Sequence, residues 1–214
     1  MNKRRVLLAD DHRILAEGLK SMLEQEFDVV AIVEDGRAMV EQAKLLRPDV
    51  IVADISMPVL NGIDALAKLT EAKLRSKVIF LTMHSEPRYA ARALQAGASG
   101  YVLKHSAKTE LVTAIGEVLS GGTYVTPEVA DKLSEVESRG STATVETLSR
   151  LTPRQREVLQ LFAEGMIAKE VAATLKISRR TAEFHKGRIM SELGIGSTAE
   201  LTQFAIKHGI ISVE

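Results

Sequence analysis

Short apolar runs rich in β-branched residues alternate with amphipathic stretches over the first 120 residues of the chain. The apolar runs span residues 5–9, 29–33, 50–53, 78–81 and 100–103, and the amphipathic stretches span 13–25, 37–46, 63–72, 87–96 and 107–119. This alternation predicts a parallel sheet with helices on both faces. The nearly continuous apolar run Val50–Ala53 suits a strand that is buried on both sides. We therefore expect an α/β domain with a five-stranded parallel sheet over residues 1–120.

The pattern changes after Leu151, where only helical periodicity remains. It predicts a small all-α domain of four helices over residues 151–214. Thr152, Pro153 and Gln155 form a capping box with proline at the first helical position, so the first of these helices should begin at Pro153. Residues 121–150 are rich in Ser, Thr and charge, with one weak helical stretch near 127–137, and we interpret them as a linker.

Composition narrows the class of protein. The chain has 214 residues, no cysteine and a formal net charge of zero. Disulfides and thiolate metal sites are therefore excluded. No apolar run approaches the length of a signal-peptide core or a membrane-spanning helix, so we expect a cytoplasmic protein that does not enter a membrane. The five histidines have no paired spacing, which argues against a histidine metal site.

Polar residues follow four of the predicted strands directly. They are Asp10 and Asp11 after the first strand, Asp54 after the third, Thr82 after the fourth and Lys104 after the fifth. In a flavodoxin-like strand order the winding direction reverses between the first and third strands, and ligands bind outside the carboxyl ends at that point. The three aspartates should therefore meet at one edge of the sheet.

Three adjacent carboxylates repel one another unless they are protonated or bind a hard divalent cation, and Mg²⁺ is the simplest candidate. A lysine and a hydroxyl opposite that cation would complete a pocket for a phosphoryl group. Asp54 would then be the nucleophile and form an aspartyl phosphate. A lone aspartate after a strand is usually a turn or cap residue, so this interpretation depends on the whole set.

The set resembles the CheY-like receiver family over nearly all of residues 3–120, through the acidic pair, Asp54-Ile55-Ser56-Met57-Pro58 with Gly62, Thr82 and Lys104. The resemblance implies that Asp11, Asp54 and the backbone carbonyl of Ser56 bind Mg²⁺, with Asp10 assisting. It also implies that Thr82 and Lys104 sense the phosphoryl group and that Tyr101 is the aromatic switch residue. Two departures are His105, where the family often has proline, and Met83, where a small residue is common.

The stretch from Leu151 to about residue 193 resembles the LuxR-type helix-turn-helix, and the two modules together have the layout of the NarL/FixJ family of response regulators. By this resemblance the groove-facing positions of the third helix are Glu183, Phe184 and Gly187, although a basic or polar residue is familiar in place of Gly187. The neighbouring cations are candidates for phosphate or base contacts with double-stranded DNA. They are Arg179, Arg180, Lys186 and Arg188.

These features predict a non-enzymatic transcription regulator: a histidine kinase phosphorylates Asp54, and phosphorylation changes sequence-specific DNA binding by a form we expect to be a homodimer. One alternative is a DNA-binding regulator that uses its receiver for dimerisation or ligand sensing without phosphorylation. Another is a phosphohydrolase with an aspartyl nucleophile. Such enzymes usually carry a second aspartate two residues after the first, where this chain has Ser56.

Overall fold

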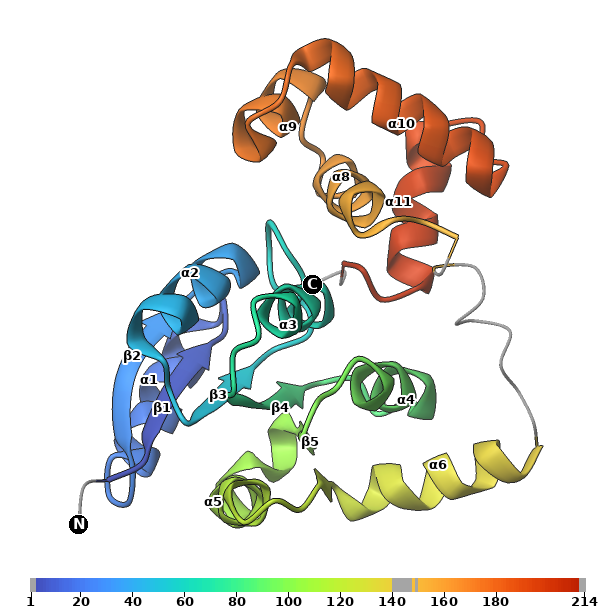
Figure 1. Cartoon of the computed structure of the whole chain (residues 1–214). Coiled ribbons are helices and arrows are strands. Elements are labelled where there is room, and N and C mark those ends of the chain that lie inside the picture. The colour runs from blue at the N-terminus through green and yellow to red at the C-terminus, as the bar shows by residue number, and fades with distance from the viewer. Residues whose placement is uncertain (1–2, 140–147, 149, 212–214) are drawn as a thin grey trace. The chain divides into compact units, whose positions relative to one another are not determined.

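The computed structural model describes residues 3–139, 148 and 150–211. The chain forms two compact units, an N-terminal α/β unit and a C-terminal all-helical unit (Figure 1). None of the described helices is long and apolar enough to cross a membrane.

The N-terminal unit contains a parallel sheet with the strand order β2-β1-β3-β4-β5-β6. The strands are β1 (Arg5–Ala9), β2 (Asp28–Val33), β3 (Val50–Ala53), β4 (Lys77–Thr82), β5 (Gly100–Leu103) and β6 (Tyr124–Val125). The first five are the predicted strands in the flavodoxin-like order. The expected total of five was wrong, because the short strand β6 extends the sheet beyond β5.

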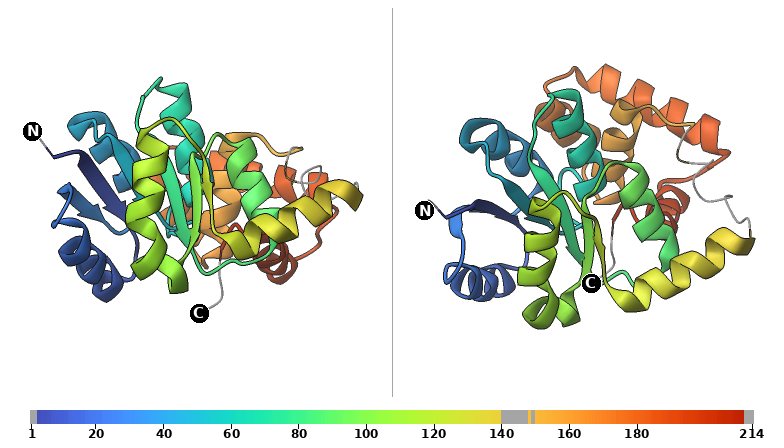
Figure 2. Two further views of the ribbon diagram at one scale, coloured as in Figure 1. Left: turned by 90° about the horizontal axis from the view of Figure 1, so that it is seen from below. Right: turned by 60° about the horizontal axis from the view of Figure 1, so that its bottom comes forward.

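Helices cover both faces of this sheet (Figure 2). They are α1 (Arg13–Leu23), α2 (Gly36–Leu46), α3 (Gly62–Glu71), α4 (Pro87–Gln95) and α5 (Ala107–Leu119), with the 3₁₀ helix η1 (Lys104–Ser106) before α5. Leu19 and Leu23 of α1 and Leu111 and Ile115 of α5 pack in one cluster with inward residues of the strands. Every residue of β3 and β5 is buried, as expected for central strands covered on both faces.

The predicted linker contains regular structure that belongs to the N-terminal unit. Strand β6 and helix α6 (Pro127–Arg139) both lie within residues 121–150, and α6 matches the weak helical stretch. Residues 140–147 and 149 of the predicted linker lie outside the described residues. The limits of the linker therefore stay a prediction.

Four helices are described in the C-terminal unit: α8 (Pro153–Ala163), α9 (Ala168–Leu175), α10 (Arg179–Leu193) and α11 (Thr198–Lys207). The capping box predicted at the start of α8 is present, with the Thr152 side chain accepting from the Gln155 backbone N–H. Ser178 accepts in the same way from Thr181 at 3.0 Å and begins α10. These caps satisfy backbone donors that a helix leaves unpaired, and the start of α8 at Pro153 is the predicted one.

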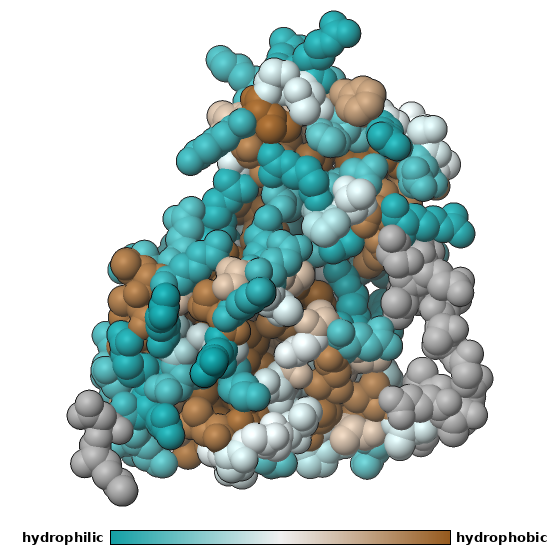
Figure 3. Space-filling view, in the orientation of Figure 1, coloured by the Kyte–Doolittle hydropathy of each residue, from teal (hydrophilic) through white to brown (hydrophobic). Residues whose placement is uncertain are grey.

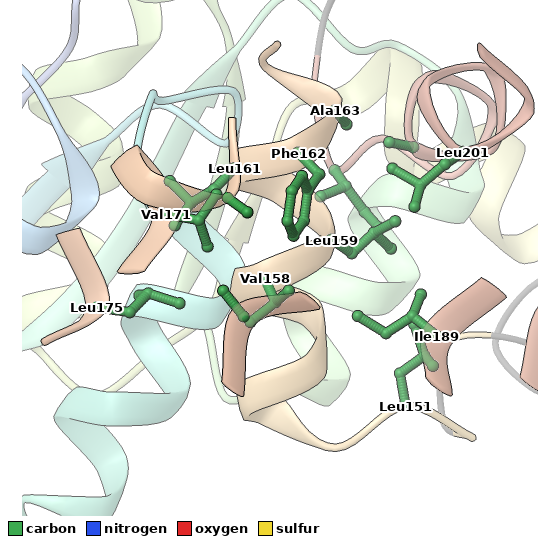
Figure 4. Packing of buried hydrophobic residues seen from close by; sticks show 14 of the residues in the cluster. Leu151, Val158, Leu159, Leu161, Phe162, Ala163, Val171, Leu175, Ile189 and Leu201 are labelled. Carbon is green, nitrogen blue, oxygen red and sulfur yellow. The ribbon is translucent and has the colours of Figure 1, made fainter. Parts of the chain in front are cut away.

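The core of the C-terminal unit gathers apolar residues from all four helices (Figure 4). Val158 and Leu159 of α8, Val171 of α9 and Ile189 of α10 are fully buried. Leu201 of α11 completes the cluster, so the four helices share one small core. Hydrophilic residues cover most of the face of this unit seen in Figure 3.

Candidate phosphorylation site and DNA-binding helix

Two buried carboxylates lie at the carboxyl edge of the sheet. Asp10 follows β1 and Asp54 follows β3, and each residue is only 4% exposed. Their backbones continue the strand ladder, because the Asp54 N–H donates to the Ala9 carbonyl at 2.8 Å and the Asp10 N–H donates to the Val33 carbonyl at 3.0 Å. The winding of the sheet reverses between β1 and β3, so the topology brings these two acids together.

Lys104 lies between the two acids. Its Nζ is 2.8 Å from Asp10 Oδ2 and 2.7 Å from Asp54 Oδ2, and its side chain is 6% exposed. Burial alone would lower the pKa of Lys104, but the attraction of Asp54 and hydrogen bonds to both carboxylates outweigh it and raise this pKa. Burial raises the pKa of Asp54, and the Lys104 cation only partly opposes that shift. Two buried carboxylates thus share the single ammonium group of Lys104.

Asp11 and His12 complete a cluster suited to a cation. Asp10, Asp11, His12 and Asp54 each offer one ligand atom, and these atoms lie within 4.8 Å of one another. Asp11 Oδ1 is buried and accepts no hydrogen bond from a described residue, although His12 Nδ1 lies 3.0 Å away. Carboxylate oxygens are the ligands that Mg²⁺ prefers, so the donor set fits that ion. His12 was not predicted at this site, because its position depends on the turn after β1.

The backbone around Asp54 is closely packed. Ser56 N–H donates to Asp54 Oδ1 at 3.3 Å, in the loop between β3 and α3. A Cβ at Gly62 would lie 2.3 Å from the Asp54 carbonyl oxygen, so only glycine fits at the first position of α3. Thr82 is fully buried at the end of β4, and its Oγ1 accepts from the His84 N–H at 3.3 Å. Asp10, Asp54, Thr82 and Lys104 therefore lie at the same edge of the sheet with Asp11 and Ser56 beside them, whereas Tyr101 lies within β5.

Tyr101 is fully buried on β5. Its hydroxyl donates to the His84 carbonyl at 2.7 Å, and burial raises its pKa. The His84 ring stacks on Tyr89 of α4 with centroids 4.2 Å apart, and its Nε2 is 2.8 Å from Ser56 Oγ. Burial lowers the pKa of His84. No sequence pattern indicated His84, because a single histidine in a loop has no periodicity or spacing to interpret.

The predicted DNA-binding residues lie along α10. Six of the seven are exposed: Arg179, Arg180, Glu183, Phe184, Gly187 and Arg188. Phe184 is 62% exposed, which is unusual for a large apolar side chain and leaves its ring available to a partner. No described atom lies within 4 Å of a Cβ built at Gly187, so this part of the helix surface is open.

Lys186 differs from the other six residues. Its Nζ donates to Thr198 Oγ1 of α11 at 2.9 Å and lies 4.7 Å from the centroid of the Phe162 ring of α8. The ammonium group thus contacts its own domain and connects α10 to two neighbouring helices. These contacts give Lys186 a structural role in addition to the predicted contact with DNA.

Comparison with known proteins agrees with this division of sites. The family model "Response regulator receiver domain" matches residues 6–116, and "Bacterial regulatory proteins, luxR family" matches residues 149–205. The chain is 38% identical to the transcriptional regulatory protein MctR of Rhizobium johnstonii, over 98% of this chain and 96% of that protein. It is 32% identical to the response regulator UvrY of Escherichia coli, with the same coverage of both chains.

A solved structure of RcsB from Salmonella enterica, bound to a promoter in the presence of the phosphomimetic BeF₃⁻, is also similar. It has a TM-score of 0.60 and 29% sequence identity, and the match covers 95% of this chain and 98% of that one. The two family matches and the whole-length relatives agree with the acidic site in one unit and the helix-turn-helix in the other. The chain belongs to the NarL/FixJ family of two-component response regulators, non-enzymatic transcription regulators that join a receiver domain to a DNA-binding LuxR-type helix-turn-helix.

Proposed function

We propose that a histidine kinase phosphorylates this protein on Asp54 and that phosphorylation controls its affinity for DNA. The observation that carries this proposal is the position of the Asp54 carboxylate, 2.7 Å from Lys104 and beside the Asp10 carboxylate at the edge of the sheet. Stability alone does not account for a buried aspartate that shares one lysine with a second acid, since buried ion pairs add little net stability. The same arrangement suits acceptance of a phosphoryl group.

Asp11, Asp54 and the carbonyl of Ser56 would hold Mg²⁺, with Asp10 assisting, and the bound ion would neutralise charge on the phosphoryl oxygens. In the transfer itself an oxygen of Asp54 forms a bond to phosphorus while the bond from phosphorus to the kinase imidazole nitrogen breaks. That nitrogen keeps the electron pair of the broken bond. Lys104 and Thr82 then bind the oxygens of the new phosphoryl group.

The DNA-binding half of the proposal uses the exposed face of α10. Arg179, Arg180 and Arg188 would contact phosphates or base edges, and Glu183 and Phe184 would contact bases in the major groove. We propose that the active form is a homodimer that reads two half-sites. The support is that RcsB, a relative with 30% sequence identity, has been solved as dimers bound to DNA.

Intact-mass measurement tests the phosphorylation step. After incubation with Mg²⁺ and acetyl phosphate, the wild type should gain the mass of one phosphoryl group and Asp54→Ala should gain none. A chelator should abolish the gain. An unchanged wild-type mass would contradict the proposal and favour a regulator that works without phosphorylation.

The link to DNA is tested with a duplex selected from a random-sequence pool by the phosphorylated wild type. Phosphorylated protein should bind this duplex more tightly than unmodified protein, and Arg188→Ala should weaken binding and flatten its dependence on salt concentration. Equal affinity of the two forms would contradict control by phosphorylation, even if Asp54 is labelled.

A further inference from the structure

The chain that follows the receiver helices is bonded to the strand that carries Tyr101. Strand β6 pairs with β5 in parallel, with Gly100 opposite Tyr124 and Tyr101 opposite Val125. The Thr126 N–H then donates to the Tyr101 carbonyl at 2.9 Å. The backbone of this segment therefore follows any movement of β5.

The side chain of Thr126 strengthens this connection. Thr126 is 2% exposed, and its Oγ1 accepts from the Leu103 N–H at 3.2 Å and donates to Glu110 Oε2 at 2.7 Å. The Tyr124 hydroxyl donates to the same Glu110 oxygen at 3.1 Å. A buried hydroxyl with both a donor and an acceptor satisfied has a strongly preferred position, because losing either partner leaves a buried polar group unpaired.

Two of the hydrogen bonds that Thr126 makes reach β5. One reaches Tyr101, and the other reaches Leu103, the residue directly before Lys104. The Thr126 carbonyl also accepts from the N–H groups of Val129 and Ala130 in the first turn of α6. A single residue thus connects β5 to the start of α6.

Helix α6 also packs beside α4. Val129 on its inner side is fully buried. Tyr89 of α4 stacks on the His84 ring. The His84 carbonyl in turn accepts a hydrogen bond from the Tyr101 hydroxyl. Helix α6 therefore packs against α4 and directly follows Thr126, the residue bonded to β5. In sequence, the DNA-binding domain follows α6.

We propose that Thr126 is a positioning residue that couples β5 to α6, so that the phosphorylation state of the receiver passes to the DNA-binding domain through the segment Tyr124–Arg139. The proposal rests on the proposed function, because it assigns the route by which phosphorylation of Asp54 acts. When Lys104 shifts to follow a phosphoryl group, Leu103 and Thr126 shift with it, and the start of α6 changes its packing against α4. The coupling depends on the Thr126 hydroxyl.

The experiment compares Thr126→Val, which removes the hydroxyl at almost constant volume, with Thr126→Ser, which keeps it. Thr109→Val is the matched control, because Thr109 is exposed on α5 and its Oγ1 donates only to the nearby Ser106 carbonyl. Full-length proteins are treated with Mg²⁺ and acetyl phosphate, and phosphoryl incorporation is measured by intact mass. Hydrogen exchange of residues 124–134 and affinity for the selected duplex are measured with and without phosphorylation.

In the wild type, phosphorylation should change exchange in residues 124–134 and should change DNA affinity by a factor within the usual range of about 5 to 150. Thr126→Val should be phosphorylated as efficiently as the wild type. Its exchange in residues 124–134 should no longer respond to phosphorylation, and the ratio of its two DNA affinities should lie within about twofold of one. Thr126→Ser and Thr109→Val should keep both effects of phosphorylation. A merely structural role would lower the melting temperature of Thr126→Val and leave the ratio of affinities unchanged.

A Thr126→Val protein with the full wild-type ratio would overturn the proposal. If this variant does not fold, Thr126→Ala decides, because it also removes the hydroxyl but places no methyl group against the Glu110 carboxylate. An unchanged ratio in Thr126→Ala would overturn the proposal as well. A wild type that is not phosphorylated, or whose DNA affinity ignores phosphorylation, would instead refute the proposed function. The two failures are therefore distinguishable.

Discussion

Gly62 at the start of α3 provides a sharp test of how the fold positions Asp54. In Gly62→Ala the new Cβ would lie 2.3 Å from the Asp54 carbonyl oxygen and 2.8 Å from Cε1 of Phe80. Non-bonded carbon contacts normally lie at about 3.5 Å or more, so the oxygen and the helix must separate by about 1 Å. The contact at Asp54 is with backbone, which cannot turn away as a side chain can. The displacement therefore reaches the phosphorylation site.

Two effects should follow from this displacement. Overpacking of a closely packed interior costs about 1 to 3 kcal/mol, and the upper part of that range applies because both neighbours of Gly62 are buried. A shift of about 1 Å in a reacting group can also slow its chemistry by about 100-fold. Gly62→Ala should therefore lower both the stability of the receiver and the rate of Asp54 phosphorylation.

Gly116→Ala is the matched control. Gly116 is exposed within α5, and no described atom lies within 4 Å of a Cβ built there. Alanine in a helix interior is more stable than glycine by about 0.5 to 1 kcal/mol, so this variant should be stabilised and phosphorylated normally. Urea unfolding followed by circular dichroism, together with mass-based phosphorylation rates, measures both effects. A Gly62→Ala protein as stable and as reactive as Gly116→Ala would refute the reasoning.

Three further substitutions have predictable outcomes. Lys104→Met leaves the Asp10 and Asp54 carboxylates without their cation, so it should lower the free energy of unfolding by about 3 to 5 kcal/mol in the presence of a chelator. Urea titration should show that added Mg²⁺ restores part of this stability. A loss of stability that does not change with Mg²⁺ would contradict the prediction. Thr152→Ala removes the cap of α8, so it should lower the stability of the C-terminal domain by about 1 kcal/mol. Thermal unfolding measures this loss, and phosphorylation should be unaffected. Gly187→Lys adds a cation to an open surface, so a salt titration of DNA binding should become steeper by about 0.9 in slope. An unchanged slope would show that this position does not face phosphates.

The acidic site was predictable because all strands of a parallel sheet end at the same edge. A residue directly after a strand lies at its carboxyl end, so Asp10, Asp54 and Lys104 could be assigned to one edge without knowledge of side-chain packing. The helix starts at Pro153 and Arg179 were predictable for a local reason. In both cases the caps Thr152 and Ser178 bond within three residues of chain.

Features that depend on tertiary packing were not predictable. Strand β6 has only two residues, and Thr126 directly after it bonds to Leu103 and Glu110, which are distant in sequence. Neither a two-residue strand nor a single threonine has a periodic pattern. The contacts of Lys186 with Thr198 and Phe162 likewise join helices that the sequence does not place relative to one another. The resemblance to the LuxR-type helix-turn-helix therefore indicated the candidate DNA contacts but not which of these cations also contacts the protein itself.

On the proposed function, the charges around Asp54 explain how phosphorylation would move β5. Asp10, Asp11 and Asp54 carry three negative charges when ionised, and Lys104 carries one positive charge, so the group has room for one divalent cation. Esterification removes the charge of the Asp54 carboxylate and adds about two negative charges on oxygens farther from the strand. The Lys104 ammonium, now 2.7 Å from Asp54, then loses one of its two partners and gains a stronger one further out. Lys104 directly follows β5, so under the proposal a new position of its ammonium group would shift the end of that strand together with the Thr126 hydroxyl bonded there.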